Sequence, residues 1–186
     1  KVEMQEKFME EIESRGKESI EQKKKKQDSL SDEICVLTMK NEGLEDDVYG
    51  LTEKQKELIG SGDKLVELNN YRGKISQKVA SVTKEHKFFT QNTVCPTCTQ
   101  SIDESFRINK IDDAQTRAKE LQSGFEKLED AIKTEQERER HFTNLSKEIT
   151  KLTHGISKNN TSVAACQRQV RELESEIQTL TSQLEN

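Results

Sequence analysis

Two cysteines near the centre of the chain flank a dipeptide, in the sequence Cys95-Pro96-Thr97-Cys98. Thiolate sulfur is a preferred ligand of Zn²⁺, and two cysteines at this spacing can supply half of a tetrahedral site. Pro96, the one proline of the chain, restricts its own φ angle and favours a turn between the two thiols. Cys95 and Cys98 are therefore the predicted metal ligands, and Zn²⁺ is the predicted metal.

A structural zinc site needs four ligands, and this turn offers only two. Cys35 and Cys166 are distant in the sequence, and His86, the nearest histidine, belongs to a predicted helix end. The simplest completion is a second copy of the chain, so that two turns share one Zn²⁺ in a homodimer. Three alternatives remain open: a disulfide, His86 as a third ligand, and redox chemistry, although the βαβ pattern of thioredoxin-like Cys-x-x-Cys motifs is absent.

The segments on both sides of the turn have the apolar spacing of a coiled coil. Apolar residues recur in alternating steps of four and three from Leu30 to Val82, and again from Ile111 to Leu184. Hydrophobic residues make up 30% of the chain, close to the two positions in seven, about 29%, that such a seam requires. With 35% charged residues and no tryptophan, the composition excludes a thick, layered core. The predicted fold class is all-α.

The turn divides the chain into two arms of nearly equal length. The first arm covers 1–92, with a predicted break near 60–62, where Gly60-Ser61-Gly62 weakens the helix. The turn covers 93–100, and the second arm covers 101–186 and opens with a capping-box pattern at Ser101. A central turn between two heptad arms predicts a long antiparallel coiled-coil hairpin, with the Cys-Pro-x-Cys turn at its apex.

Pairing the arms about the midpoint of the turn predicts a register. Leu44 would face Ile149, and most other apolar seam residues of the first arm would also meet an apolar partner. A slip by one heptad would preserve the seam almost as well, so this symmetry supports pairing more strongly than it determines register. The apolar residues that would meet a polar partner are Ile34, opposite Asn159, and Leu58, opposite Glu135.

An antiparallel coiled coil with Cys95-Pro96-Thr97-Cys98 at its apex resembles the zinc hook of the SMC-like ATPase of the double-strand-break repair nuclease complex, the SbcC-type family. The resemblance implies that Cys95 and Cys98 bind zinc, that Pro96 forms the turn, and that two hooks share one Zn²⁺. Family members often carry glycine after the second cysteine, where this chain has Thr99. The excess of lysine over arginine is consistent with a phage or bacterial member.

The function implied by this resemblance is a non-catalytic dimerisation and tethering segment of a DNA repair and recombination complex. No Gly-x-x-x-x-Gly-Lys-Ser/Thr motif is present, so the ATPase head, with its nuclease subunit and DNA, is expected outside this segment of a longer parent protein. With a net charge of −5, direct DNA contact is not expected, and Lys23 to Lys26 are interpreted as a solvated helix face. The alternatives are a generic structural coiled-coil tether and a thiol-redox module.

The sequence also carries information on cellular location. No apolar run is long enough to span a membrane, and Lys1-Val2-Glu3 has no signal-peptide character. Four cysteines, two of them isolated, are too few for a disulfide scaffold. The expectation is an intracellular, reducing compartment, which is the cytoplasm if the source is bacterial or a phage.

Overall fold

The computed structural model describes residues 2–185 and is all-helical over this range, with 91% helix and no strands. This confirms the predicted fold class. The helices are α1 (Val2–Lys56), α2 (Ser61–Gln91) and α3 (Glu104–Glu185). No helix within 2–185 has both the length and the apolar character needed to cross a membrane.

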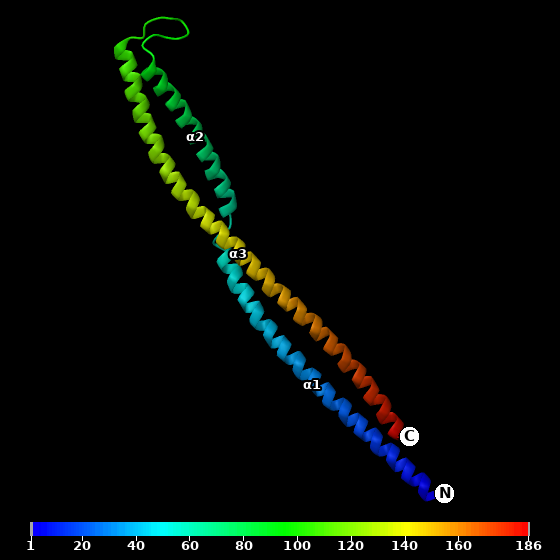
Figure 1. Ribbon diagram of the computed structural model, residues 1–186. Helices are drawn as coiled ribbons and strands as arrows, with labels where there is room; N and C mark the ends of the chain where they lie inside the picture. Colours follow the sequence, from blue (N-terminus) through cyan, green and yellow to red (C-terminus); the bar gives the residue numbers. More distant parts are fainter. Residues whose placement is uncertain (1, 186) are drawn as a thin grey trace. The chain divides into compact units, whose positions relative to one another are not determined.

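The contacts divide the chain into two units. Unit 1 contains the chain up to Lys54 together with the chain from Ser146 onward, and unit 2 contains Gln55–Leu145. Each unit therefore pairs one part of α3 with a segment that precedes it in the sequence (Figure 1). The cysteine-containing turn lies in unit 2.

In unit 1, α1 and the C-terminal part of α3 run in opposite directions. This follows from the order of their contacts, because partners on α3 come earlier in the sequence as positions on α1 come later. Cys166 and Leu173 are buried on the α3 side. The contacting pairs are Gly16–Leu184, Lys23–Glu176, Asn41–Asn160 and Leu44–Gly155.

The register of unit 1 differs from the predicted register by about one heptad. Leu44 lies against Gly155 and not opposite Ile149. The amide Nδ2 of Asn41 donates to Oδ1 of Asn160 (2.8 Å), and Nδ2 of Asn159 donates to Oδ1 of Asn41 (2.9 Å). Asn41 is only 6% exposed, and an unpaired buried amide costs about 1–3 kcal/mol. The observed register therefore pairs these amides with each other, whereas the predicted one placed Asn159 opposite Ile34.

In unit 2, α2 and the N-terminal part of α3 also run in opposite directions, as their ion pairs and ring contacts show. The buried apolar residues Val82, Ala114, Ile132 and Leu145 lie in this unit. The predicted pairing of Leu58 with Glu135 is wrong, because Glu135 forms its ion pair with Lys64. The contacting pairs are Lys64–Glu135, Arg72–Glu129, Glu85–Arg117 and Phe89–Phe106.

The helical path is interrupted at residues 57–60, between α1 and α2. Gly60 has a φ angle of +87°, in the left-handed region that glycine adopts without steric cost, and α2 restarts at the next residue. Gly62, which the sequence analysis included in the predicted break, lies inside α2.

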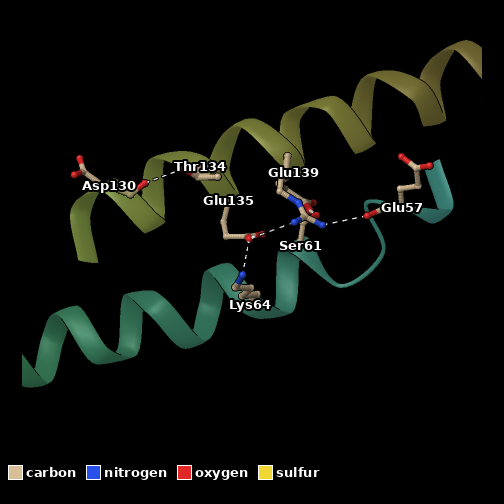
Figure 2. Close-up of polar contacts among 8 residues, drawn as sticks. Glu57, Ser61, Lys64, Asp130, Thr134, Glu135 and Glu139 are labelled. Carbon is tan, nitrogen blue, oxygen red and sulfur yellow. Dashed lines mark hydrogen bonds and ion pairs between the residues drawn. The ribbon is translucent and has the colours of Figure 1, made fainter. Parts of the chain in front are cut away.

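A polar cluster lies beside this interruption (Figure 2). Ser61 Oγ donates to Glu139 Oε2 (2.6 Å), and Lys64 Nζ lies 2.9 Å from Glu135 Oε1. Arg138 Nη2 donates to the backbone carbonyl of Glu57 (3.1 Å). The carbonyls at the C-terminal end of a helix have no intrahelical partner. The guanidinium of Arg138 therefore supplies a donor to a carbonyl at the end of α1.

Candidate metal-binding turn

The turn between α2 and α3 is closed by a short antiparallel arrangement of backbone. The N–H of Cys95 donates to the carbonyl of Gln100 (2.8 Å), and the N–H of Ile102 donates to the carbonyl of Thr93 (2.9 Å). Val94 and Ser101 form an isolated antiparallel bridge between these two bonds. The segment Cys95 to Gln100 is thereby held as a compact loop.

The start of α3 differs in detail from the capping box expected at Ser101. Ser101 lies in the isolated bridge, and Oδ2 of Asp103 accepts a hydrogen bond from the N–H of Phe106 (3.0 Å). Asp103 therefore caps α3, which begins at Glu104. Because the backbone pairing extends past Gln100, α3 begins later in the sequence than the capping box predicts.

The two cysteines are brought together by hydrogen bonds to sulfur. The pKa of Cys95 is lowered by hydrogen bonds from the backbone N–H groups of Cys98 and Thr97, and also by one from the Cys98 thiol. Such bonds favour the thiolate over the thiol, and the thiolate is the form that binds a metal. The N–H of Thr99 donates to the carbonyl of Cys95 (2.9 Å) and closes the turn around these sulfurs.

Both thiols of the turn are accessible and unmodified. Cys95 is half-buried and Cys98 is exposed, and both are free cysteines. The Cys98 thiol also lies 3.7 Å from Oε1 of Gln100, within hydrogen-bonding reach for sulfur. Two accessible sulfurs can supply two of the four ligands of a tetrahedral thiolate site. The backbone N–H groups that bond to sulfur also suit such a site, because hydrogen bonds of this kind orient metal ligands.

Thr99 has an unusual backbone conformation. Its φ angle is +59°, and within residues 2–185 it is the one non-glycine residue with positive φ. Its hydroxyl donates to the carbonyl of Cys98 (2.7 Å). The position directly after the second cysteine, where SbcC-type zinc hooks often carry glycine, is therefore occupied here by a threonine in the left-handed region.

The base of the turn is held by an aromatic cluster and an arginine. The ring of Phe89 makes edge contacts with Phe88 and Phe106, at centroid distances of 5.1 and 5.8 Å. Arg107 Nη1 donates to the carbonyl of Phe89 (3.0 Å), and the same guanidinium pairs with Glu104 (2.7 Å). Arg107 was not among the site residues predicted from the sequence. The spacing of Glu104 and Arg107 predicts an ion pair along one helix. The spacing does not predict that Arg107 also bonds to the carbonyl of Phe89 across the turn.

The remaining residues singled out from the sequence lie elsewhere. Cys35 is exposed and Cys166 is buried, both are free thiols, and both belong to unit 1. Burial, with an added contribution from Glu33, raises the pKa of Cys166. His86 lies within α2, and Lys23 forms an ion pair with Glu176.

Across the part of the chain that the structure describes, no three or more His, Cys, Asp and Glu side chains gather into a group that could hold a metal ion. The turn contributes a pair of sulfur donors. Comparison with protein-family models, with curated proteins and with solved structures found no match. Function is therefore inferred from the chemistry of the turn and from the helices that carry it.

Proposed function

We propose that the chain is a dimerisation and tethering segment, in which the Cys95-Pro96-Thr97-Cys98 turns of two copies share one Zn²⁺. One observation carries this proposal. The Cys95 N–H bond to the carbonyl of Gln100 (2.8 Å) closes a loop that holds the accessible thiols of Cys95 and Cys98, and hydrogen bonds from the Cys98 and Thr97 N–H groups lower the pKa of Cys95. Two chains together would supply four thiolates, which is a complete tetrahedral set for zinc.

The arrangement of the helices supports a hairpin that presents this turn at its apex. In both units the paired segments run in opposite directions, and α2 and α3 are connected directly by the turn. The heptad spacing of apolar residues along these helices is typical of a coiled coil. In this proposal the helices act as a spacer and the turn acts as the joint.

By its resemblance to SbcC-type zinc hooks, we place this segment in a DNA double-strand-break repair and recombination ATPase. The nuclease subunit and the DNA would be bound by the ATPase head of the parent protein. Zinc ligation by Cys95 and Cys98 needs reduced thiols, which fits an intracellular location.

A thiol-redox module is the second candidate, because a lowered pKa is also typical of reactive Cys-x-x-Cys motifs. The two functions differ in what controls association. Zinc-mediated joining responds to chelators, whereas disulfide-mediated joining responds to reductants. A generic coiled-coil tether would respond to neither.

The experiment measures bound zinc and molecular mass in solution, in the presence of reductant. We expect about one zinc ion per two chains and a dimer that a chelator separates into monomers. The variant with both Cys95→Ser and Cys98→Ser is expected to lose the zinc and the chelator-sensitive dimer. The matched control carries Cys35→Ser and Cys166→Ser, which change two cysteines outside the turn.

Three results would contradict the proposal. The first is a dimer that persists with chelator and in the Cys95/Cys98 variant, as a generic tether predicts. The second is association that depends on oxidant and needs no zinc, as a redox module predicts. The third is equal loss of zinc from the control variant, which would locate the metal site elsewhere.

A further inference from the structure

Thr99 occupies a conformation that its side chain disfavours. At a φ angle of +59° the Cβ of an L-residue crowds the backbone, and a β-branched residue there is a genuine outlier. Glycine has no Cβ and avoids this cost, and asparagine tolerates it better than most residues. The conformation therefore needs compensation from the surrounding contacts.

The compensation comes from the bonds that form the cysteine loop. The N–H of Thr99 donates to the carbonyl of Cys95 (2.9 Å), and the hydroxyl of Thr99 donates to the carbonyl of Cys98 (2.7 Å). The next residue, Gln100, accepts the hydrogen bond from the N–H of Cys95 (2.8 Å). A left-handed residue at position 99 reverses the chain after Cys98 and returns Gln100 to Cys95.

The strained residue and the metal ligands are thus part of one closed loop. If Thr99 relaxed to a negative φ angle, the chain after Cys98 would leave in another direction. The bond from Cys95 to Gln100 would then be lost, together with the closure that keeps the Cys98 N–H near the Cys95 sulfur. Holding the two sulfurs ready for a metal requires the unfavourable conformation of Thr99.

We propose that Thr99 is a positioning residue that weakens the zinc-mediated joint, because its strained backbone favours opening of the metal-free loop and metal binding must then restore the closed loop. This inference rests on the proposed function and concerns the strength of the same site. Each dimer contains two turns, so the cost is incurred twice. A joint weakened in this way separates more readily than one built on an unstrained turn.

The test replaces Thr99 by residues that fit the left-handed region. Thr99→Gly and Thr99→Asn are both expected to tighten the zinc-dependent dimer. Strain of this kind corresponds to at most about tenfold in affinity for each turn, or about a hundredfold for a dimer with two. Asparagine is included because glycine also increases the freedom of the unfolded turn, which reduces its apparent gain. The measurements are zinc affinity by competition with a chromogenic chelator and dimer dissociation by sedimentation at fixed zinc.

Two control variants separate backbone strain from side-chain effects. Thr99→Val keeps the β-branch and removes the hydroxyl, so it is expected to bind zinc more weakly than the parent. Thr93→Gly makes the glycine substitution at another threonine of the turn whose φ angle is not positive, and no tightening is expected from it. Cobalt spectra of each variant report whether the ligand set remains tetrahedral.

The outcomes distinguish this inference from the proposed function. If the parent protein binds no zinc, the proposed function fails, whatever Thr99 does. If the parent binds zinc but Thr99→Gly and Thr99→Asn bind no more tightly, the inference about strain is overturned and the proposed function stands. Equal tightening by Thr93→Gly would also overturn it, because glycine would then act through general flexibility.

Discussion

At Cys95, hydrogen bonds from two backbone N–H groups lower the pKa of the thiol and favour the thiolate. The pair Cys95 and Cys98 could be recognised from the sequence, because spacing and Pro96 are visible there. The left-handed conformation of Thr99 and the cap at Asp103 could not be recognised. Both depend on the pairing of Val94 with Ser101, a contact formed only when the chain folds back on itself.

The thiols of Cys95 and Cys166 are expected to differ in reactivity. The pKa of Cys95 is lowered by N–H bonds to its sulfur, and the pKa of Cys166 is raised by burial. An alkylating reagent reacts with the thiolate, so the rate at Cys95 should rise at a lower pH than that of an ordinary thiol, about 8.5, and the rate at Cys166 at a higher pH.

The measurement follows iodoacetamide labelling against pH, without metal, in proteins that retain one cysteine each. In the protein that retains only Cys95, serine at position 98 keeps the backbone N–H that bonds to the Cys95 sulfur. Superimposable profiles for Cys95 and Cys166 would show that the turn and the buried site do not tune their thiols.

At the scale of the helices, composition and heptad spacing were enough to predict that the chain is helical. They were not enough to predict register, because a seam of apolar residues matches itself again after a slip of about seven positions. Polar residues remove this degeneracy. Asn41 meets Asn159 and Asn160, and Oε1 of Glu135 meets Lys64, although Oε2 of Glu135 has no hydrogen-bond partner.

Asn41→Leu is expected to destabilise unit 1. The substitution leaves the half-buried amide of Asn159 without its partner, at a cost of about 1 kcal/mol, whereas the exposed amide of Asn160 can bond to water. Replacing all three asparagines by leucine should recover this stability, because no half-buried amide is then left without a partner. Urea unfolding measures both effects, and Asn70→Leu, at an exposed position of α2, serves as the control.

The contrary result would be equally informative. If Asn41→Leu were as stable as the parent, the amide pairing would not determine the register. Spin labels on α1 and α3 of the triple variant would show whether the helices had slipped by a heptad.

At the scale of the whole molecule, the proposed joint links association to pH. Zinc ligation requires four thiolates, and protons compete with the metal for each of them. The dimer should therefore be complete at neutral pH and separate as the pH falls. The lowered pKa of Cys95 moves this separation to more acidic conditions than ordinary thiols would give.

Sedimentation at fixed total zinc, in steps from about pH 7.5 to 5, follows this transition. Restoring neutral pH should restore the dimer, because no covalent bond is broken. A mass that stayed constant over this range, with zinc still bound, would contradict thiolate-mediated joining.

The interruption at residues 57–60 has a mechanical consequence. In unit 2 this interruption faces an unbroken stretch of α3. Backbone hydrogen bonds along the helix axis are therefore continuous in α3 but not in the antiparallel helical segment that precedes and includes α2. If the pair were pulled lengthwise, tension on the interrupted side would fall on the contacts of Ser61, Lys64 and Arg138 with their partners. Elongation under load should therefore begin there, well away from the sulfurs that would bind the metal.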